Sequence, residues 1–151
     1  MKSLVIVESG AKAKKIQGYL VSSFPEIEWQ VEACVGHVRD LSDKENAVDP
    51  NDWTNLKWEF SSKGNKVMRE LRKFCKDSST LYLATDPDRE GEAIAWHILS
   101  DFNQKKLVED IDVKRVTFNE ITPSAIKKAI ESPREIDKDL VEAYLARRIL
   151  D

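Results

Sequence analysis

The sequence predicts an α/β domain whose central sheet is mostly parallel. Two short apolar runs, at 3–7 and 80–84, lack polar alternation, which is typical of strands that are buried on both faces of a parallel sheet. Longer segments between and after these runs repeat apolar residues at helical spacing. Strands that alternate with helices favour a parallel sheet covered by helices. A chain of 151 residues fits one domain with its own core.

The first part of the chain is expected to form a strand, a helix and a second strand. After the strand at 3–7, residues 11–24 place apolar side chains on one stripe, which predicts a helix. Residues 28–35 alternate well enough for a strand. We interpret 36–40 as a polar turn and 42–55 as a long surface loop, which at that length is either functional or mobile.

The rest of the chain is expected to be richer in helices. Thr122 followed by Pro123 is typical of a helix start, since threonine caps and proline suits the first helical position. We predict strands at 57–60 and 112–118, and helices at 63–76, about 88–101, 123–131 and about 138–150.

Composition excludes several classes of protein. The net charge of −3 rules out a polycation, so any nucleic-acid contact must come from a local basic patch. Cys34 and Cys75 lie far apart, without zinc spacing or a disulfide framework, which suits a reducing cytosol. The apolar run at the start is too short for a signal peptide, and no segment is long and apolar enough for a membrane span.

An acidic stretch follows the apolar run at 80–84. Asp86, Asp88 and Glu90 stand at alternate positions, and we expect them to gather at the carboxyl end of the strand, where open α/β sheets bind ligands. Carboxylate oxygens of this kind suit Mg²⁺. The alternative is that Asp86 caps the next helix, with Pro87 at the first helical position and the other acids facing the helix dipole. The two readings are compatible, and the local pattern leaves both open.

A second charged group stands where the first strand should end. Glu8 follows the apolar run, and Lys12, Lys14 and Lys15 occupy the opening turns of the next helix, where the dipole prefers acids. Cations at this unfavourable end of the helix indicate that positive charge is needed beside Glu8 for a function. The alternative is that these lysines only solvate an exposed face.

Taken together, these motifs resemble the Toprim domain, and more narrowly the N-terminal Toprim domain of bacterial type IA DNA topoisomerases. The resemblance spans essentially the whole chain and implies a Rossmann-like fold with about four mostly parallel strands flanked by helices. It also implies that residues 1–151 are one domain, the N-terminal part of a longer multidomain chain. One departure is Gly10, where the family usually has proline. The motifs are Val5–Lys14 and Asp86–Glu92, supported by 35–41, 93–97, 117–122 and 146–151.

The resemblance also implies roles for individual residues. Asp86 and Asp88 would bind Mg²⁺, with Glu90 in or just behind the metal shell. Glu8 would lie beside the ion and the scissile phosphate as proton donor and acceptor for the 3′ oxygen, while Lys12 would contact the phosphate.

Four further residues are weaker candidates for this site. Arg89, Arg147 and Arg148 are candidates for DNA backbone contacts, and His37 for a neighbour of the active site. Purely structural roles remain open for all four.

The activity implied by the resemblance is relaxation of negatively supercoiled DNA without ATP. A tyrosine breaks one strand by transesterification, and the strand is later resealed. Tyr19, Tyr82 and Tyr144 do not lie in the family's tyrosine motif, so the nucleophile is expected from a later domain and this fragment alone should be inactive. The implied partners are a single-stranded segment of DNA and the remaining domains of the same chain, in a cytoplasmic, nucleoid-associated monomer.

Two other functions remain open at this point. One is a different Toprim phosphotransfer enzyme, such as a primase or a nuclease. The other is a non-catalytic α/β binding module whose acids only cap helices.

Overall fold

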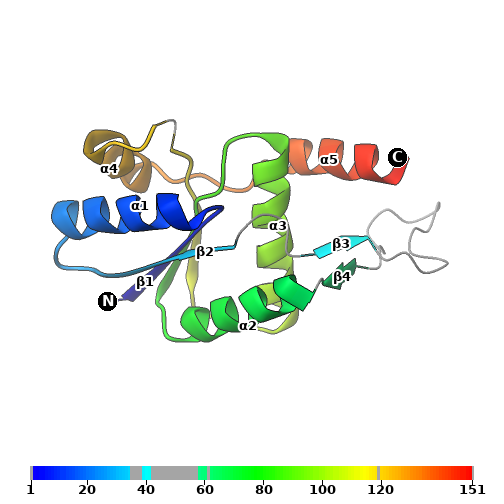
Figure 1. Ribbon diagram of the computed structural model, residues 1–151, viewed down its shortest axis with the longest axis horizontal. Helices are drawn as coiled ribbons and strands as arrows, with labels where there is room; N and C mark the ends of the chain where they lie inside the picture. Colours follow the sequence, from blue (N-terminus) through cyan, green and yellow to red (C-terminus); the bar gives the residue numbers. More distant parts are fainter. Residues whose placement is uncertain (1, 35–38, 42–57, 61, 119, 151) are drawn as a thin grey trace.

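The computed structural model describes residues 2–34, 39–41, 58–60, 62–118 and 120–150, and it has the predicted α/β architecture (Figure 1). Within these residues no helix is long and apolar enough to cross a membrane. In chain order the elements are β1 (Lys2–Val7), α1 (Gly10–Ser23), β2 (Glu28–Ala33), β3 (Arg39–Leu41), β4 (Trp58–Phe60), α2 (Ser62–Lys76), β5 (Thr80–Leu83), α3 (Arg89–Gln104), β6 (Asp112–Arg115), α4 (Pro123–Glu131) and α5 (Lys138–Leu150).

A four-stranded parallel sheet in the order β2-β1-β5-β6 forms the centre of the domain. The prediction of about four mostly parallel strands flanked by helices is thereby confirmed. Strands β1 and β5 are neighbours, with Ser3 opposite Thr80 and Ile6 opposite Leu83. This register brings the carboxyl ends of the two strands together, and with them the two charged motifs of the sequence.

Helices cover both faces of this sheet, with α1 and α4 on one side and α2 and α3 on the other (Figure 1). Successive side chains of a strand point to opposite faces. Leu4 and Ile6 of β1 therefore belong to the core under α2 and α3, while Val5 and Val7 belong to the core under α1 and α4. Burial on both faces explains why this strand has no polar alternation in its sequence.

Two predicted segments differ from the structure. The turn predicted at 36–40 is wrong at its end, because Arg39–Leu41 forms β3, which pairs antiparallel with β4. A three-residue strand is too short to show an alternating pattern. Residues 35–38 and the loop predicted at 42–55 lie outside the described residues. The strand predicted at 112–118 ends at Arg115, because its neighbour β5 ends at Leu83, whose carbonyl accepts the last bond of this pair from the Val116 N–H at 3.0 Å.

The acidic turn between β5 and α3 is folded tightly against the start of the helix. Asp88 caps α3 and its carboxylate accepts a hydrogen bond from the Gly91 N–H at 2.7 Å, so the alternative that Asp86 is the cap was wrong. Thr85 donates its hydroxyl to the Gly91 carbonyl at 2.6 Å. A Cβ on Gly91 would lie 1.9 Å from the Asp86 carbonyl oxygen. Only glycine lets the turn approach the helix this closely.

The buried guanidinium of Arg115 binds the backbone of the same turn. Arg115 is 1% exposed and donates to the carbonyls of Leu83 at 3.0 Å, Thr85 at 2.7 Å and Asp86 at 2.8 Å. These are the last residue of β5 and two residues of the turn. One side chain from β6 therefore fixes the backbone path from the strand into the acidic motif.

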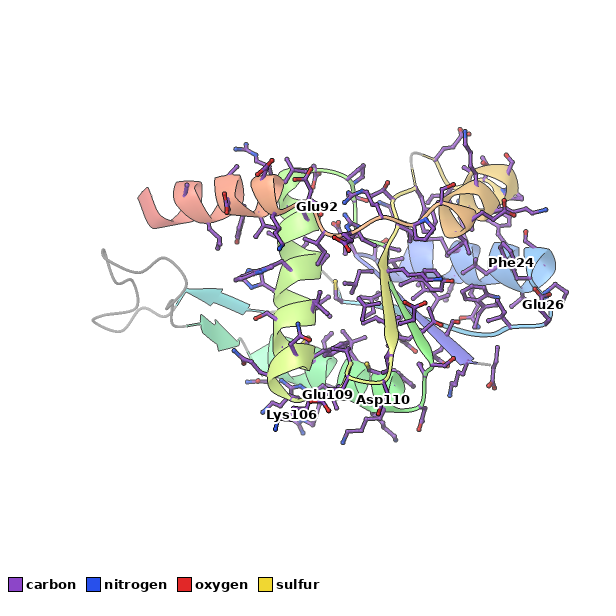
Figure 2. All side chains as sticks on the ribbon, turned by 180° about the vertical axis from the view of Figure 1, so that it is seen from behind. Phe24, Glu26, Glu92, Lys106, Glu109 and Asp110 are labelled. Carbon is purple, nitrogen blue, oxygen red and sulfur yellow. The ribbon has the colours of Figure 1, made fainter. Side chains whose placement is uncertain are left out.

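Glu92 neutralises this buried cation. Its carboxylate is fully buried and lies 2.8 Å from the Arg115 guanidinium. It also accepts hydrogen bonds from the Arg134 side chain and, at 2.9 Å, from the Asp137 N–H. Figure 2 shows Glu92 in α3 beside the segment that leads into α5. Glu92 thus joins the acidic turn, β6 and the approach to α5.

The surroundings of Glu92 keep it ionised. Burial alone would raise the pKa of this carboxyl, but the hydrogen bonds from Arg134, Arg115 and the Asp137 N–H outweigh burial and lower the pKa below its ordinary value. A lowered folded-state pKa stabilises the protein above the unfolded pKa. That stabilisation is lost as the pH falls through the folded value.

We predict that Gly91→Ala destabilises the domain, because the new methyl group would collide with the Asp86 backbone. The expected cost is about 1–3 kcal/mol, the range for an overpacked site. Gly18→Ala is the matched control, because a Cβ on this exposed α1 glycine meets nothing. It should stabilise by up to about 1 kcal/mol through helix propensity. Denaturant unfolding measures both, and equal effects of the two variants would contradict the prediction.

We also predict that Glu92→Gln lowers the free energy of unfolding at neutral pH, by about 3 kcal/mol, because it leaves the buried Arg115 cation without a counter-charge. In the unchanged protein this contribution should fade as the pH falls below about 4.3, the unfolded glutamate pKa. The variant should therefore lose less stability on acidification. Glu70→Gln, on the exposed face of α2, should change stability by less than about 0.5 kcal/mol. If the free energies of unfolding of Glu92→Gln and of the unchanged chain fell by equal amounts as the pH is lowered, this role of Glu92 would be refuted.

Candidate active site

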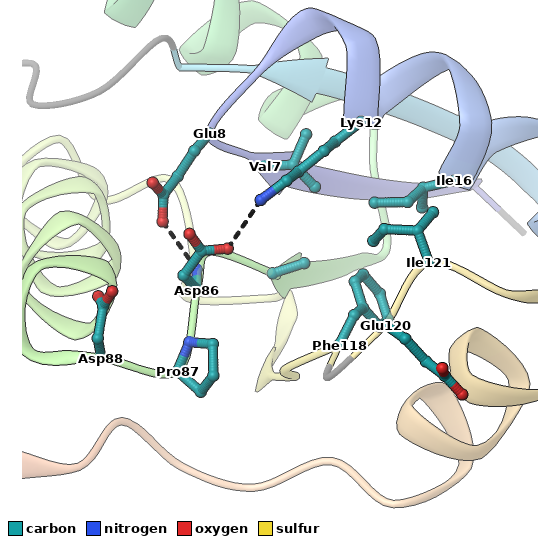
Figure 3. A pocket seen from close by; sticks show the side chains of 11 residues that line it. Val7, Glu8, Lys12, Ile16, Asp86, Pro87, Asp88, Phe118, Glu120 and Ile121 are labelled. Carbon is teal, nitrogen blue, oxygen red and sulfur yellow. Dashed lines mark hydrogen bonds and ion pairs between the residues drawn. The ribbon is translucent and has the colours of Figure 1, made fainter.

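A cavity of about 470 Å³ opens at the carboxyl ends of β1 and β5 (Figure 3). Five charged residues line it, namely Glu8, Lys12, Asp86, Asp88 and Glu120. The sequence predicted the first four as site residues, and the structure brings them to one cavity. The edge of the sheet at which they lie is the one where open α/β sheets bind ligands.

Lys12 reaches from α1 to the acidic turn. Its ammonium group lies 3.1 Å from Asp86 Oδ1. The start of α1 sets its place, since Ser9 caps the helix and its hydroxyl accepts a hydrogen bond from the Lys12 N–H at 3.3 Å. The carboxylate of Asp86 compensates a cation that the helix dipole disfavours. The two side chains are 43% and 41% exposed, so this pair is weak and readily exchanged.

Glu8 makes a second connection between the two strand ends. Its Oε1 accepts a hydrogen bond from the Asp86 N–H at 2.8 Å, across 78 positions of sequence. Figure 3 shows this bond and the Lys12–Asp86 pair converging on Asp86 from two sides. The Glu8 carboxylate is therefore held at the rim of the cavity, next to the acid that pairs with the lysine.

The carboxylates supply oxygen ligands of the kind that Mg²⁺ prefers. Within the described residues no three His, Cys, Asp or Glu side chains are grouped closely enough to hold a metal ion. Mg²⁺ often binds through one or two carboxylates together with water and substrate phosphate, so Asp86 and Asp88 fit such a site. Glu90 is exposed on the first turn of α3 and does not line the cavity.

The four weaker candidates lie apart from this cluster or cannot be placed. Arg89 is exposed at the first position of α3 and does not line the cavity. Arg147 and Arg148 belong to α5, but their side chains lie outside the described part, as does the whole of His37.

Three tyrosines are present, and the cavity is lined by none of them. Tyr82 is buried in β5 against Trp29, and Tyr144 packs edge-on against His97. Tyr19 lies on α1 and packs against the core beneath that helix.

Gly10 is compatible with the proline that the resemblance leads one to expect. It is the first residue of α1, a position that tolerates proline because its N–H has no partner in the helix. Ser9 before it is extended, with φ −129° and ψ 149°, as a residue preceding proline prefers. A Cβ on Gly10 would meet nothing. A proline would therefore fit at this position as well.

Sequence reasoning missed the residues that support this site from behind. Glu92 was read as one more acid of the motif, and Arg115 as part of a strand. The available signal was a charged residue within each of two buried elements, because buried charges are nearly always paired. Phe118 and Ile121, which line the cavity, were also missed as site residues.

Comparisons with known proteins agree with this geometry. Residues 3–121 match the family described as "Toprim domain". The chain is 49% identical over 150 residues to DNA topoisomerase 1 of Xylella fastidiosa (strain Temecula1), covering 99% of this chain and 18% of that protein. It is also 49% identical over 149 residues to DNA topoisomerase 1 of Zymomonas mobilis, covering 98% of this chain and 12% of that protein.

A solved structure shows the same likeness. Full-length topoisomerase I from Thermotoga maritima superposes with a TM-score of 0.76 and is 39% identical, over 97% of this chain and 23% of that one. The chain thus spans less than a fifth of the length of these curated relatives. Since the family match covers well over half of its residues, this chain belongs to the Toprim domain family.

Proposed function

We propose that this chain is the metal-binding Toprim domain of a type IA DNA topoisomerase, the N-terminal part of a longer multidomain protein. The observation that carries the proposal is the convergence of Glu8 and Lys12 on Asp86 within one cavity. A proton-transfer group, a cation and an acidic metal ligand are the parts needed for phosphoryl transfer. The topoisomerase names of the relatives support the same function.

In the proposed reaction, a tyrosine from a later domain attacks a phosphodiester of one DNA strand. The tyrosine hydroxyl loses its proton to water, its oxygen bonds to phosphorus, and the bond from phosphorus to the 3′ oxygen breaks. The tyrosyl oxygen takes up a proton again when the strand is resealed. Glu8 gives a proton to the departing 3′ oxygen and takes it back when the 3′ hydroxyl reseals the strand. Passage of a strand through the transient break would relax negatively supercoiled DNA, without ATP.

Lys12 is the group that we propose for contact with the phosphate. Its pair with Asp86 is about 40% exposed on both sides, so the ammonium can move to a phosphate oxygen at little cost. A cation at that oxygen stabilises the negative charge that develops during transfer.

Asp86 and Asp88 would hold Mg²⁺, with Glu8 and Glu90 next to or just behind the metal shell. When bound, the ion would neutralise charge on the phosphoryl oxygens and orient the DNA strand. Lys12 and the capping N–H of Gly91 keep the two aspartates in place without it.

We further propose that the domain works with a single-stranded segment of DNA and with the remaining domains of its own chain. Arg89, Arg147, Arg148 and His37 are candidates for contacts to the DNA backbone or to the edge of the site. The full protein would act as a monomer in the cytoplasm, associated with the nucleoid.

The first prediction from this proposal is that residues 1–151 alone neither cleave nor relax supercoiled DNA, because the tyrosines of this chain lie away from the cavity. Gel assays of plasmid topology in the presence of Mg²⁺ measure this, with the full-length protein as the positive control. Relaxation by the isolated chain would contradict the proposed division of the active site.

The second prediction concerns Asp86→Asn together with Asp88→Asn in the full-length protein. Metal-dependent relaxation should fall, while the fold is kept, because asparagine caps a helix about as well as aspartate. Asp77→Asn with Asp110→Asn, two exposed acids, changes the net charge equally and should leave relaxation unchanged. Relaxation measured over a range of Mg²⁺ concentrations decides the matter, and equal activity of the two double variants would reject the metal assignment.

A further inference from the structure

The cavity has a second side that the proposed phosphate chemistry does not use. Opposite Glu8, Asp86 and Asp88 lie Ile16, Phe118 and Ile121, which we call the apolar wall, with Glu120 on the same side as the wall (Figure 3). Ile16 comes from α1, and the other two come from the segment between β6 and α4. These three side chains carry no polar atoms, so this wall adds no hydrogen-bonding group to the site.

Phe118 and Ile121 are the accessible part of the apolar wall. Ile16 is fully buried in the core beneath α1 and α4. Phe118 and Ile121 pack against that core but are only partly buried. An aromatic ring that is fixed on one side and accessible on the other is a ready surface for stacking.

We propose that the apolar wall binds the base and sugar of the nucleotide whose phosphate contacts Lys12. This inference rests on the proposed function and names a nucleoside subsite within it. A phosphate near Lys12 has a nucleoside covalently attached, and the wall belongs to the same cavity. A volume of about 470 Å³ lies within the range of about 300–1,000 Å³ that is usual for small-molecule sites.

The charges of the cavity favour a nucleoside over a second phosphate on this side. Lys12 is the one cation among the described residues that line the cavity, against four carboxylates. A second anion beside the wall would meet these carboxylates without a cation of its own. The uncharged part of the nucleotide is therefore the part that fits there. Since the wall offers no hydrogen bonds, it should accept any of the four bases, as stacking platforms do.

The test uses the full-length protein without Mg²⁺ and short single-stranded oligonucleotides, and fluorescence anisotropy measures binding. A single abasic residue is placed at each position in turn. At one position, loss of the base should weaken binding by about tenfold, the scale of one stacked base. Phe118→Leu should weaken binding of the intact strand similarly and remove the effect of that abasic residue. Ile121→Ala, a second variant, should reduce the abasic effect in part.

Two controls separate the possible failures. Val21→Ala alters an exposed apolar residue of α1 outside the cavity and should leave the abasic profile unchanged. Lys12→Ala tests the phosphate contact itself, and unchanged binding in that variant would overturn the proposed function together with the subsite. If Lys12→Ala weakens binding but the abasic profile is the same with and without Phe118, the subsite alone is wrong. In that case another part of the protein covers the apolar wall.

Discussion

The buried ion pair between Arg115 and Glu92 is the constraint on which the acidic turn depends. Taking both charges out of water costs several kcal/mol per ion, and this cost is offset only if every hydrogen-bonding group is satisfied. Here the guanidinium also binds the carbonyls of Leu83, Thr85 and Asp86, and the carboxylate also binds Arg134 and the Asp137 N–H. These bonds bring the acidic turn, β6 and the segment before α5 into contact. The backbone of the acidic motif is thereby fixed before any ligand arrives.

The charged side chains that line the cavity make weaker contacts than Arg115 and Glu92 do. Among the described residues, Glu8 makes one hydrogen bond, and the Lys12–Asp86 pair is substantially exposed. An exposed pair contributes little to stability, so its members can exchange partners when a phosphate enters. Within the proposed function, the domain therefore separates two tasks: buried charges at Glu92 and Arg115 set the geometry, while exposed charges at the cavity would take part in the chemistry. A substitution of Glu92 or Arg115 should therefore change stability, and a substitution of the charged residues at the cavity should change the proposed catalysis.

The chain spans only a fraction of the length of each relative, and its cavity holds one part of the proposed active site. It holds acids, a lysine and an apolar wall, but its tyrosines lie elsewhere. Charged groups on one side and the ring of Phe118 on the other suit a nucleotide, which carries its charge at the phosphate and an uncharged, stackable base at the other end. The proposed nucleophile would then approach from outside the domain, toward a phosphate positioned by this chain. Within the proposal, the cavity thus positions the DNA strand but does not supply the nucleophile.

By itself, the sequence determined the fold class, most elements and four of the charged residues that line the cavity. These depend on local patterns, namely unbroken apolar runs for β1 and β5, helical spacing for the helices, and the charged residues at strand ends. Only the tertiary structure decided which groups meet. The Glu8–Asp86 bond spans 78 positions, and Glu92 finds its partners in Arg115 and Arg134. It also decided that Asp88 rather than Asp86 caps α3, because the close approach of Gly91 to the turn sets where the helix begins. Such contacts follow from strand order and packing, which local periodicity does not encode.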